Sequence, residues 1–325
     1  MIKFGSFIPQ GWLGELKGYA PRKGFEAIKN VALQCERLGF DSIWVYDHFI
    51  TFPEVTTEAC FESWTTLIAL ATLTKKVGLG QLVTCNSYRY PAVLAKMGAT
   101  LDVISNGRLN LGIGAGWYKL EYDAYGIPYP KDSVRLAQLR EAVQIIKKMW
   151  TEDEPSFQGQ YYTIDKAINS PKPIQKPHPP ILIGGQGRRL TLRLVAEFAD
   201  RCNFGGPITP QQYKELLEIL DEHCRQVGRK VNQIEKTLIV DSTVIARNRT
   251  ALEKKIRKFK PKNVSKTQFI EGNLVGIPEE IVSRIGEFID VGVTYAMVRF
   301  PDMLEDEPLQ LFAEEVMPAF RCAHA

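Results

Sequence analysis

The sequence predicts a (β/α)8 TIM barrel with insertion segments near the C-terminal mouth, and three observations support this. Short runs rich in β-branched and aromatic residues alternate with longer segments of helical periodicity, the pattern of a parallel sheet covered by helices. Eight strand signals occur, each followed by a helix, which favours a closed barrel over an open doubly wound sheet. Composition does not shift along the 325 residues, so we expect one domain over 1–325.

The strand predictions rest on short runs that either alternate or are apolar throughout. Residues 108–114, "RLNLGIG", alternate, whereas 181–184, "ILIG", read as a fully buried strand. The eight strands are predicted at 2–8, 42–46, 77–83, 108–114, 181–184, 201–204, 237–246 and 295–300.

The helix predictions rest on apolar residues at helical spacing and on start and stop signals. The segment 25–38 is apolar along one face and is followed by Gly39, and Pro91 opens another helix. Residues 133–150 form a strongly amphipathic pattern. The helices are predicted at 25–38, 64–74, 91–104, 133–150, 189–199, 211–227, 278–292 and 309–318.

Two long segments do not fit a minimal barrel. Residues 151–180 hold six prolines and a hairpin-like stretch, and residues 260–277 are basic and polar. Long loops of this kind are usually functional or mobile. We therefore expect insertions that act as lids or cofactor covers.

Composition limits the classes of partner. The net charge of +4 is too small to indicate nucleic acid, and the apolar runs are too short to cross a membrane. The basic run 253–266 is interpreted as a solvated helix face followed by a loop, with a landing site for a polyanion as the alternative. The start of the chain lacks a signal-peptide pattern, so we expect a cytoplasmic protein. The six cysteines form no C-x-x-C pair, which predicts free thiols and no metal site.

Barrel active sites form at the C-terminal ends of the strands, which directs attention to Asp47 and His48 after the second strand. An imidazole titrates near neutrality and can pass a proton in either direction. A structural Asp–His contact that caps the next helix is the alternative. The other histidines, His178, His223 and His324, are expected to be structural or solvated.

Two glycine-rich stretches also lie at strand ends. The turn Gly184-Gly185-Gln186-Gly187 precedes a helix expected near Arg188, and its N–H groups suit a phosphate; a tight turn is the alternative. The second stretch, 112–116, has the spacing G-x-G-x-G on a fourth strand, so it does not match a dinucleotide fingerprint. We interpret it as a face cleared for a flat ring or a backbone.

Several motifs in order resemble the luciferase-like monooxygenase superfamily, and more closely its coenzyme F420-dependent oxidoreductases. The resemblance covers nearly the whole chain. It is carried by "GFDSIWVYDHF", "VTCNSYRYPAVLAKMGATLDVIS", "LDVISNGRLNLGIGAGWYKLEYDAYGIPYP", "PKPIQKPHPPILIGGQG" and "VGIPEEIVSRIGEF".

The resemblance implies a barrel that binds a flavin or deazaflavin at its mouth. Asp47 and His48 would lie beside the ring, with His48 as the substrate-side acid/base. A non-prolyl cis peptide would fall near Gln81-Leu82, behind the ring. The remaining implied cofactor contacts are Thr84 and Ala115 and Gly116 at the ring, and Gly184, Gly185, Gln186 and Gly187 at the phosphate.

Trp117 departs from one branch of this family. Sugar-phosphate dehydrogenases carry a glutamate two residues after the position of Ala115, where this sequence has Trp117. That carboxylate is absent unless Glu121 or another group substitutes for it, which puts a sugar-phosphate substrate in doubt. Trp117 is expected to wall an apolar pocket or to stack on a ring.

The function implied by the resemblance is hydride transfer between F420 and a small organic substrate, in a homodimer. The cofactor carries the difficult chemistry and the protein supplies orientation and the proton. One alternative is an FMN-dependent monooxygenase supplied by a separate reductase. Another is a flavin-binding barrel without catalysis, or an unrelated phosphate-binding barrel.

Overall fold

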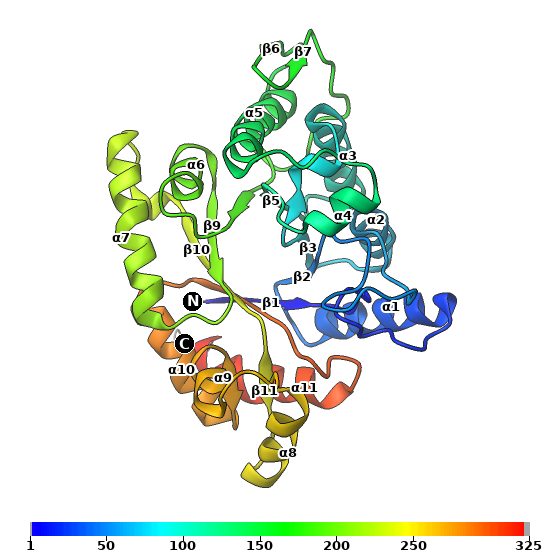
Figure 1. Ribbon diagram of the computed structural model, residues 1–325, viewed down its shortest axis with the longest axis vertical. Helices are drawn as coiled ribbons and strands as arrows, with labels where there is room; N and C mark the ends of the chain where they lie inside the picture. Colours follow the sequence, from blue (N-terminus) through cyan, green and yellow to red (C-terminus); the bar gives the residue numbers. More distant parts are fainter. Residues whose placement is uncertain (1, 322–325) are drawn as a thin grey trace.

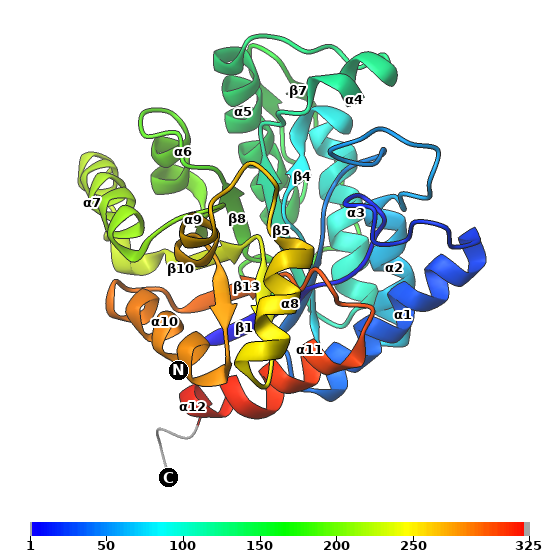
Figure 2. The same cartoon turned by 60° about the horizontal axis from the view of Figure 1, so that its bottom comes forward.

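Eight parallel strands close into a barrel in the computed structural model, which describes residues 2–321. The ring closes where β3 pairs with β5, and the first strand pairs with the last one. This confirms the predicted barrel, and Figures 1 and 2 show its helices arranged around the outside. In spatial order the strands are β1 (Lys3–Phe7), β2 (Ser42–Val45), β3 (Gly78–Gln81), β5 (Leu109–Gly114), β8 (Ile181–Gly184), β9 (Arg201–Gly205), β10 (Glu235–Val240) and β13 (Tyr295–Val298).

Helices follow the barrel strands and cover their outer faces. The start of α7 shows how the sequence sets a boundary: Thr209 and Gln212 form a capping box, and Pro210 occupies the first turn. The helices are α1 (Pro21–Arg37), α2 (Ser63–Leu73), α3 (Pro91–Ile104), α4 (Lys119–Ala124), α5 (Asp132–Thr151), α6 (Thr191–Phe198), α7 (Pro210–Gln226), α8 (Arg249–Phe259), α9 (Lys266–Glu271), α10 (Pro278–Asp290), α11 (Asp306–Leu311) and α12 (Pro318–Arg321).

The main core lies inside the barrel and between its strands and the helices. Trp150 of α5 is buried, and its indole Nε1–H donates to the Ala95 carbonyl of α3 at 2.8 Å. This contact lets a large aromatic side chain be buried without leaving its polar atom unpaired. None of the helices within residues 2–321 is both long and apolar enough to cross a membrane.

The predicted strand 237–246 is wrong as a single strand, because the chain leaves the barrel after Val240. The separate strand β11 (Thr243–Ile245) pairs with β12 (Leu274–Gly276) in a two-stranded sheet. Ile245 packs in the main core, whereas a second small core with α8 and α9 is formed by Val244, Ala246, Leu252, Ile256 and Phe269. The polar residues Asp241 and Ser242 separate the apolar residues of β10 from those of β11.

The segment 151–180 forms a hairpin on the outside of α5. Its strands are β6 (Phe157–Gln158) and β7 (Thr163–Ile164). The Glu141 carboxylate of α5 accepts hydrogen bonds from the backbone N–H groups of residues 160–162, at 2.8–2.9 Å. The hairpin is therefore fixed to the side of the barrel.

Candidate active site

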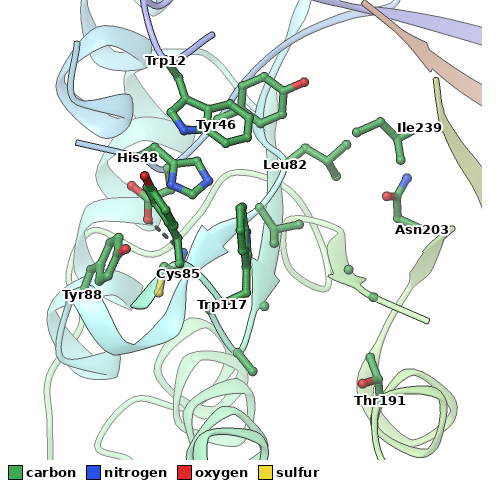
Figure 3. A pocket seen from close by; sticks show the side chains of 18 of the residues that line it. Trp12, Tyr46, His48, Leu82, Cys85, Tyr88, Trp117, Thr191, Asn203 and Ile239 are labelled. Carbon is green, nitrogen blue, oxygen red and sulfur yellow. Dashed lines mark hydrogen bonds between the residues drawn. The ribbon is translucent and has the colours of Figure 1, made fainter. Parts of the chain in front are cut away.

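A pocket of about 370 Å³ opens at the C-terminal mouth of the barrel. Figure 3 shows aromatic side chains and His48 gathered at one end, with Thr191, Asn203 and Ile239 at the other. Eight residues singled out from the sequence line it: Asp47, His48, Leu82, Ala115, Gly116, Trp117, Gly184 and Gly185. Within residues 2–321, four others do not line it: Gln81 and Thr84 are buried in the barrel, and Gln186 and Gly187 lie in an exposed turn.

His48 is held from behind by a buried carboxylate. Its Nδ1 lies 2.8 Å from Oε2 of Glu121, a fully buried residue of α4. The same Oε2 accepts the Tyr88 hydroxyl at 2.7 Å, and Oε1 accepts the N–H groups of Phe49 and Ile50 at 2.7 and 3.2 Å. All of these contacts stabilise a carboxylate.

The pKa of Glu121 lies below its ordinary value. Burial alone would raise it, but the hydrogen bond and charge of His48, together with the Tyr88 hydroxyl and the Phe49 N–H, outweigh that effect. An ionised Glu121 can only accept, so Nδ1 of His48 carries a proton and donates it. In the neutral form of the imidazole the lone pair is therefore on Nε2, where it can take a proton from a substrate.

The imidazole ring of His48 is also fixed by aromatic contacts. The indole of Trp12 stacks on it with ring centroids 4.1 Å apart and an interplanar angle of 8°. Trp117 approaches edge-on at 5.8 Å and is 56% exposed, so it forms an outer wall of the pocket. The two indoles hold the ring plane and leave an apolar surface beside its nitrogen.

The carboxylate of Asp47 is already occupied by the protein. Arg89 donates to both of its oxygens, at 2.7 and 2.9 Å. The Ser63 hydroxyl and the Cys85 N–H add bonds of 2.8 Å each. Asp47 therefore joins the ends of neighbouring strands through its carboxylate, and it also lines the pocket. Its place beside a cofactor ring stays a prediction.

The predicted strand 77–83 ends at Gln81 in the structure. The cis peptide bond expected near Gln81-Leu82 is one residue further on, between Leu82 and Val83. After it, the short strand β4 (Thr84–Cys85) pairs with the outer half of β5. Leu82 and Val83 thereby come to line the pocket.

The glycines of 112–116 make room for other parts of the chain, which is the backbone alternative of the expectation. Contact of Gly116 with a cofactor ring stays a prediction. A Cβ on Gly112 would meet the Gln81 carbonyl oxygen at 2.0 Å, and one on Gly114 would meet the Val83 side chain at 2.7 Å. Gly116 has φ of +78°, and a Cβ there would meet the Tyr122 hydroxyl at 1.9 Å. Each glycine is required by close packing within the protein.

Replacing Gly112 by alanine is expected to lower the free energy of unfolding by at least about 1–3 kcal/mol, because the methyl group collides with backbone. Gly286→Ala is the matched control: a Cβ there meets nothing within 4 Å, and the residue lies inside α10. That control should raise stability by up to about 1 kcal/mol. Urea unfolding monitored by tryptophan fluorescence measures both, and equal midpoints would contradict the packing argument.

The turn after β8 offers unpaired backbone donors. Helix α6 begins at Thr191, three residues later than expected, and the turn before it is exposed. The N–H groups of residues 186–190 donate to no acceptor within residues 2–321. Gly185 adopts φ of +123°, which suits glycine. Successive free N–H groups ahead of a helix fit an anionic oxygen group.

Glu121 does not replace the carboxylate missing at position 117. It is fully buried behind His48, does not line the pocket, and accepts four hydrogen bonds. Trp117 itself lines the pocket.

Three residues that shape the site were not predicted from the sequence: Trp12, Tyr88 and Arg89. Tyr88 and Arg89 lie in and just after the 3-10 turn Asn86–Tyr88, directly after β4. The rule that strand ends carry the site would have included both residues. Trp12 lies in the loop after β1, where the sequence contained no signal that its ring reaches His48.

Apart from Cys85, the other histidines and cysteines of residues 2–321 do not line the pocket. Nδ1 of His178 lies 2.8 Å from the Pro179 carbonyl oxygen, and Nε2 of His223 lies 2.8 Å from that of Arg188. The cysteines within the described residues are free, and Cys85 lines the pocket. His324 and Cys322 lie outside the described residues.

The chain is similar in sequence to known proteins over nearly its whole length. The family described as luciferase-like monooxygenase matches residues 2–273. An F420-dependent glucose-6-phosphate dehydrogenase of Amycolatopsis mediterranei is 27% identical, over 94% of this chain and 97% of the relative. One of the same name from Kineococcus radiotolerans is 28% identical, over 98% of each chain.

Solved structures share the fold. An F420-dependent secondary alcohol dehydrogenase in complex with an F420-acetone adduct superposes with a TM-score of 0.81, at 24% identity and 98% coverage of both chains. The F420-dependent tetrahydromethanopterin reductase of Methanopyrus kandleri gives 0.78, at 22% identity, over 98% of this chain and 99% of that one.

Proposed function

The chain belongs to the luciferase-like monooxygenase family, and from that premise we propose that it is an F420-dependent oxidoreductase. It would transfer a hydride between the cofactor and a small organic substrate, with His48 as the substrate-side acid/base. One observation carries the proposal: His48 lines the pocket while the ionised Glu121 fixes its Nδ1, which leaves Nε2 for a substrate proton. The names of the full-length relatives support the choice of cofactor.

The residues present fit this cofactor. Leu82, Val83 and Ala115 give the pocket apolar and backbone surfaces suited to a flat ring. The exposed N–H groups of the turn 186–190 would hold the phosphodiester. When bound, F420 supplies a ring carbon that accepts or donates hydride.

The protein supplies the proton transfer. If an alcohol is oxidised, Nε2 of His48 takes the hydroxyl proton as the carbon–hydrogen bond gives up its hydride, so a carbonyl forms. If a carbonyl is reduced, the same nitrogen returns that proton. The Glu121 carboxylate stabilises the imidazolium in either direction without taking the proton itself. Trp12 and Trp117 exclude water from one side of the reacting group.

Cofactor titration tests the proposal. We expect oxidised F420 to quench the tryptophan fluorescence of the purified protein with a micromolar dissociation constant, because Trp12 and Trp117 both line the pocket. FMN and riboflavin serve as comparison ligands under the same conditions. Micromolar binding of FMN with none of F420 would contradict the proposal and favour an FMN-dependent monooxygenase. If none of them bound, a barrel of another function would be indicated.

The family likeness also supports a homodimeric, cytoplasmic enzyme, and we include both in the proposal. Size-exclusion chromatography with light scattering measures the first directly. A mass of one 36.7 kDa chain at micromolar concentration would contradict the dimer.

A further inference from the structure

A second cavity, of about 690 Å³, lies beside the first at the barrel mouth. We propose that it binds the distal part of an uncharged, polyhydroxylated substrate whose reacting carbon lies at His48. Asp241 and Arg299 are the central recognition groups. This inference rests on the proposed function, because it specifies the substrate class of the same enzyme.

The second cavity lies between the barrel and the unit of α8 and α9. Asp241 and Arg299 directly follow β10 and β13, which pair with Val240 opposite Val298. The two cavities adjoin across β10, because Ile239 lines the first and Asp241 the second. The charges of Arg299 and Asp241 also act on the hydroxyl of Tyr46, which lines the first cavity. One extended molecule can therefore contact both.

Asp241 and Arg299 are unpaired although they occupy adjacent register positions. Neither side chain makes a hydrogen bond or an ion pair with any group in residues 2–321. Burial raises the pKa of Asp241 against the lowering effect of Arg299. A half-buried acid and base that face a cavity without partners retain their hydrogen-bonding capacity for a ligand.

Other polar groups around the cavity add both donors and acceptors. Gln212 and Gln268 use their carbonyl oxygens on backbone N–H groups, at 2.9 and 3.1 Å, so their amide N–H groups remain available. Asn273 has a buried side-chain oxygen with no partner in residues 2–321. A hydroxyl both donates and accepts, so a mixed lining of this kind suits a ligand with several hydroxyls.

The charges around the cavity do not favour a phosphate. Within residues 2–321, Arg299 is the one cation in the lining, against the carboxylates of Asp241 and Glu271. The Lys260 ammonium lies beside the cavity but donates to the carbonyls of Pro261 and Val264, at 3.0 and 2.6 Å. The cavity therefore offers no excess of positive charge to a phosphate, whereas a neutral polyol needs none.

Calorimetry on the protein saturated with F420 tests the inference. The neutral probes are D-glucose, D-sorbitol and myo-inositol; glucose 6-phosphate is the charged probe, and 2-propanol lacks the additional hydroxyls. We expect at least one neutral polyol to bind at least about tenfold more tightly than glucose 6-phosphate and 2-propanol. A site built to bind hydroxyls discriminates against analogues without them. Tighter binding of glucose 6-phosphate, or no binding by any neutral polyol, would overturn the inference.

Variants locate the binding. Asp241→Asn and Arg299→Gln should each weaken polyol binding by about tenfold or more. Their affinity for F420 should stay unchanged, which also reports correct folding. Gln268→Ala removes one amide donor and should weaken polyol binding by a smaller factor. The exposed pair Asp306→Asn and Arg257→Gln are controls expected to have no effect. Unchanged polyol affinity in both cavity variants would place the ligand elsewhere. Failure of F420 itself to bind would instead contradict the proposed function.

Discussion

Replacing His48 by alanine is expected to lower kcat/KM by about 10²- to 10⁴-fold, the usual contribution of a positioned general acid or base. Among residues 2–321, the variant removes the one imidazole that lines the pocket, while the other lining residues and the turn 186–190 remain unchanged. F420 affinity should therefore stay within about threefold of the original value. Stopped-flow measurement of the F420 absorbance change gives the rate, and fluorescence quenching gives the affinity.

Two further measurements separate a proton-transfer role from a structural one. Added imidazole should restore part of the rate to His48→Ala, because a free base can enter the space left by the ring. His178→Ala is the matched control, since this histidine contacts a connector carbonyl outside the pocket, and its turnover should not change. Full turnover in His48→Ala would show that the proton is handled by another group.

Replacing Glu121 by glutamine should reduce both stability and rate. The amide presents a donor where His48, Tyr88, Phe49 and Ile50 all require an acceptor, so the free energy of unfolding should fall by about 3–5 kcal/mol. The wrong His48 tautomer is then favoured, and kcat should fall by about 10²- to 10⁴-fold. Chemical unfolding and single-turnover kinetics measure the two effects separately.

The stability effect of Glu121 has a defined pH dependence. Its pKa is lowered in the folded protein, so its contribution is fully present above the unfolded-state pKa and is lost as pH falls through the folded one. The difference between the original protein and Glu121→Gln should therefore be largest near neutral pH and shrink on acidification. Asp123→Asn, an exposed residue of the same helix, should change stability by less than about 0.5 kcal/mol at any pH. A pH-independent difference would argue against an ionised Glu121.

The sequence was sufficient to predict the barrel fold and the region in which the candidate site lies. The alternation of strand and helix is a local property, and the rule that barrel sites lie at the C-terminal strand ends pointed to His48 directly. The prediction failed at residues 237–246, where two strands of different sheets were read as one. Asp241 and Ser242 are turn-favouring residues that mark the break between them, and this signal was not used.

The hydrogen-bond partners of the site residues could not be predicted from local sequence patterns. Glu121 lies 73 residues from His48, and Arg89 lies 42 from Asp47, so each contact depends on how the strands are ordered in space. The donors to the Asp47 carboxylate, namely Ser63, Cys85 and Arg89, come from separate segments and could not be paired with it from the sequence. The glycines of 112–116 likewise pointed to close approach, while the approaching group, the chain around Gln81 and Val83, was identifiable only in three dimensions.

Pairing of the first strand with the last has a consequence for biosynthesis. One edge of β1 pairs with β2 soon after both leave the ribosome, whereas its other edge must wait for β13, nearly 290 residues later. Until then the nascent sheet exposes the backbone of β1, an open edge that invites association with other chains. The ring closes only when translation is almost complete, so exposure of this edge during synthesis is built into the order of the strands.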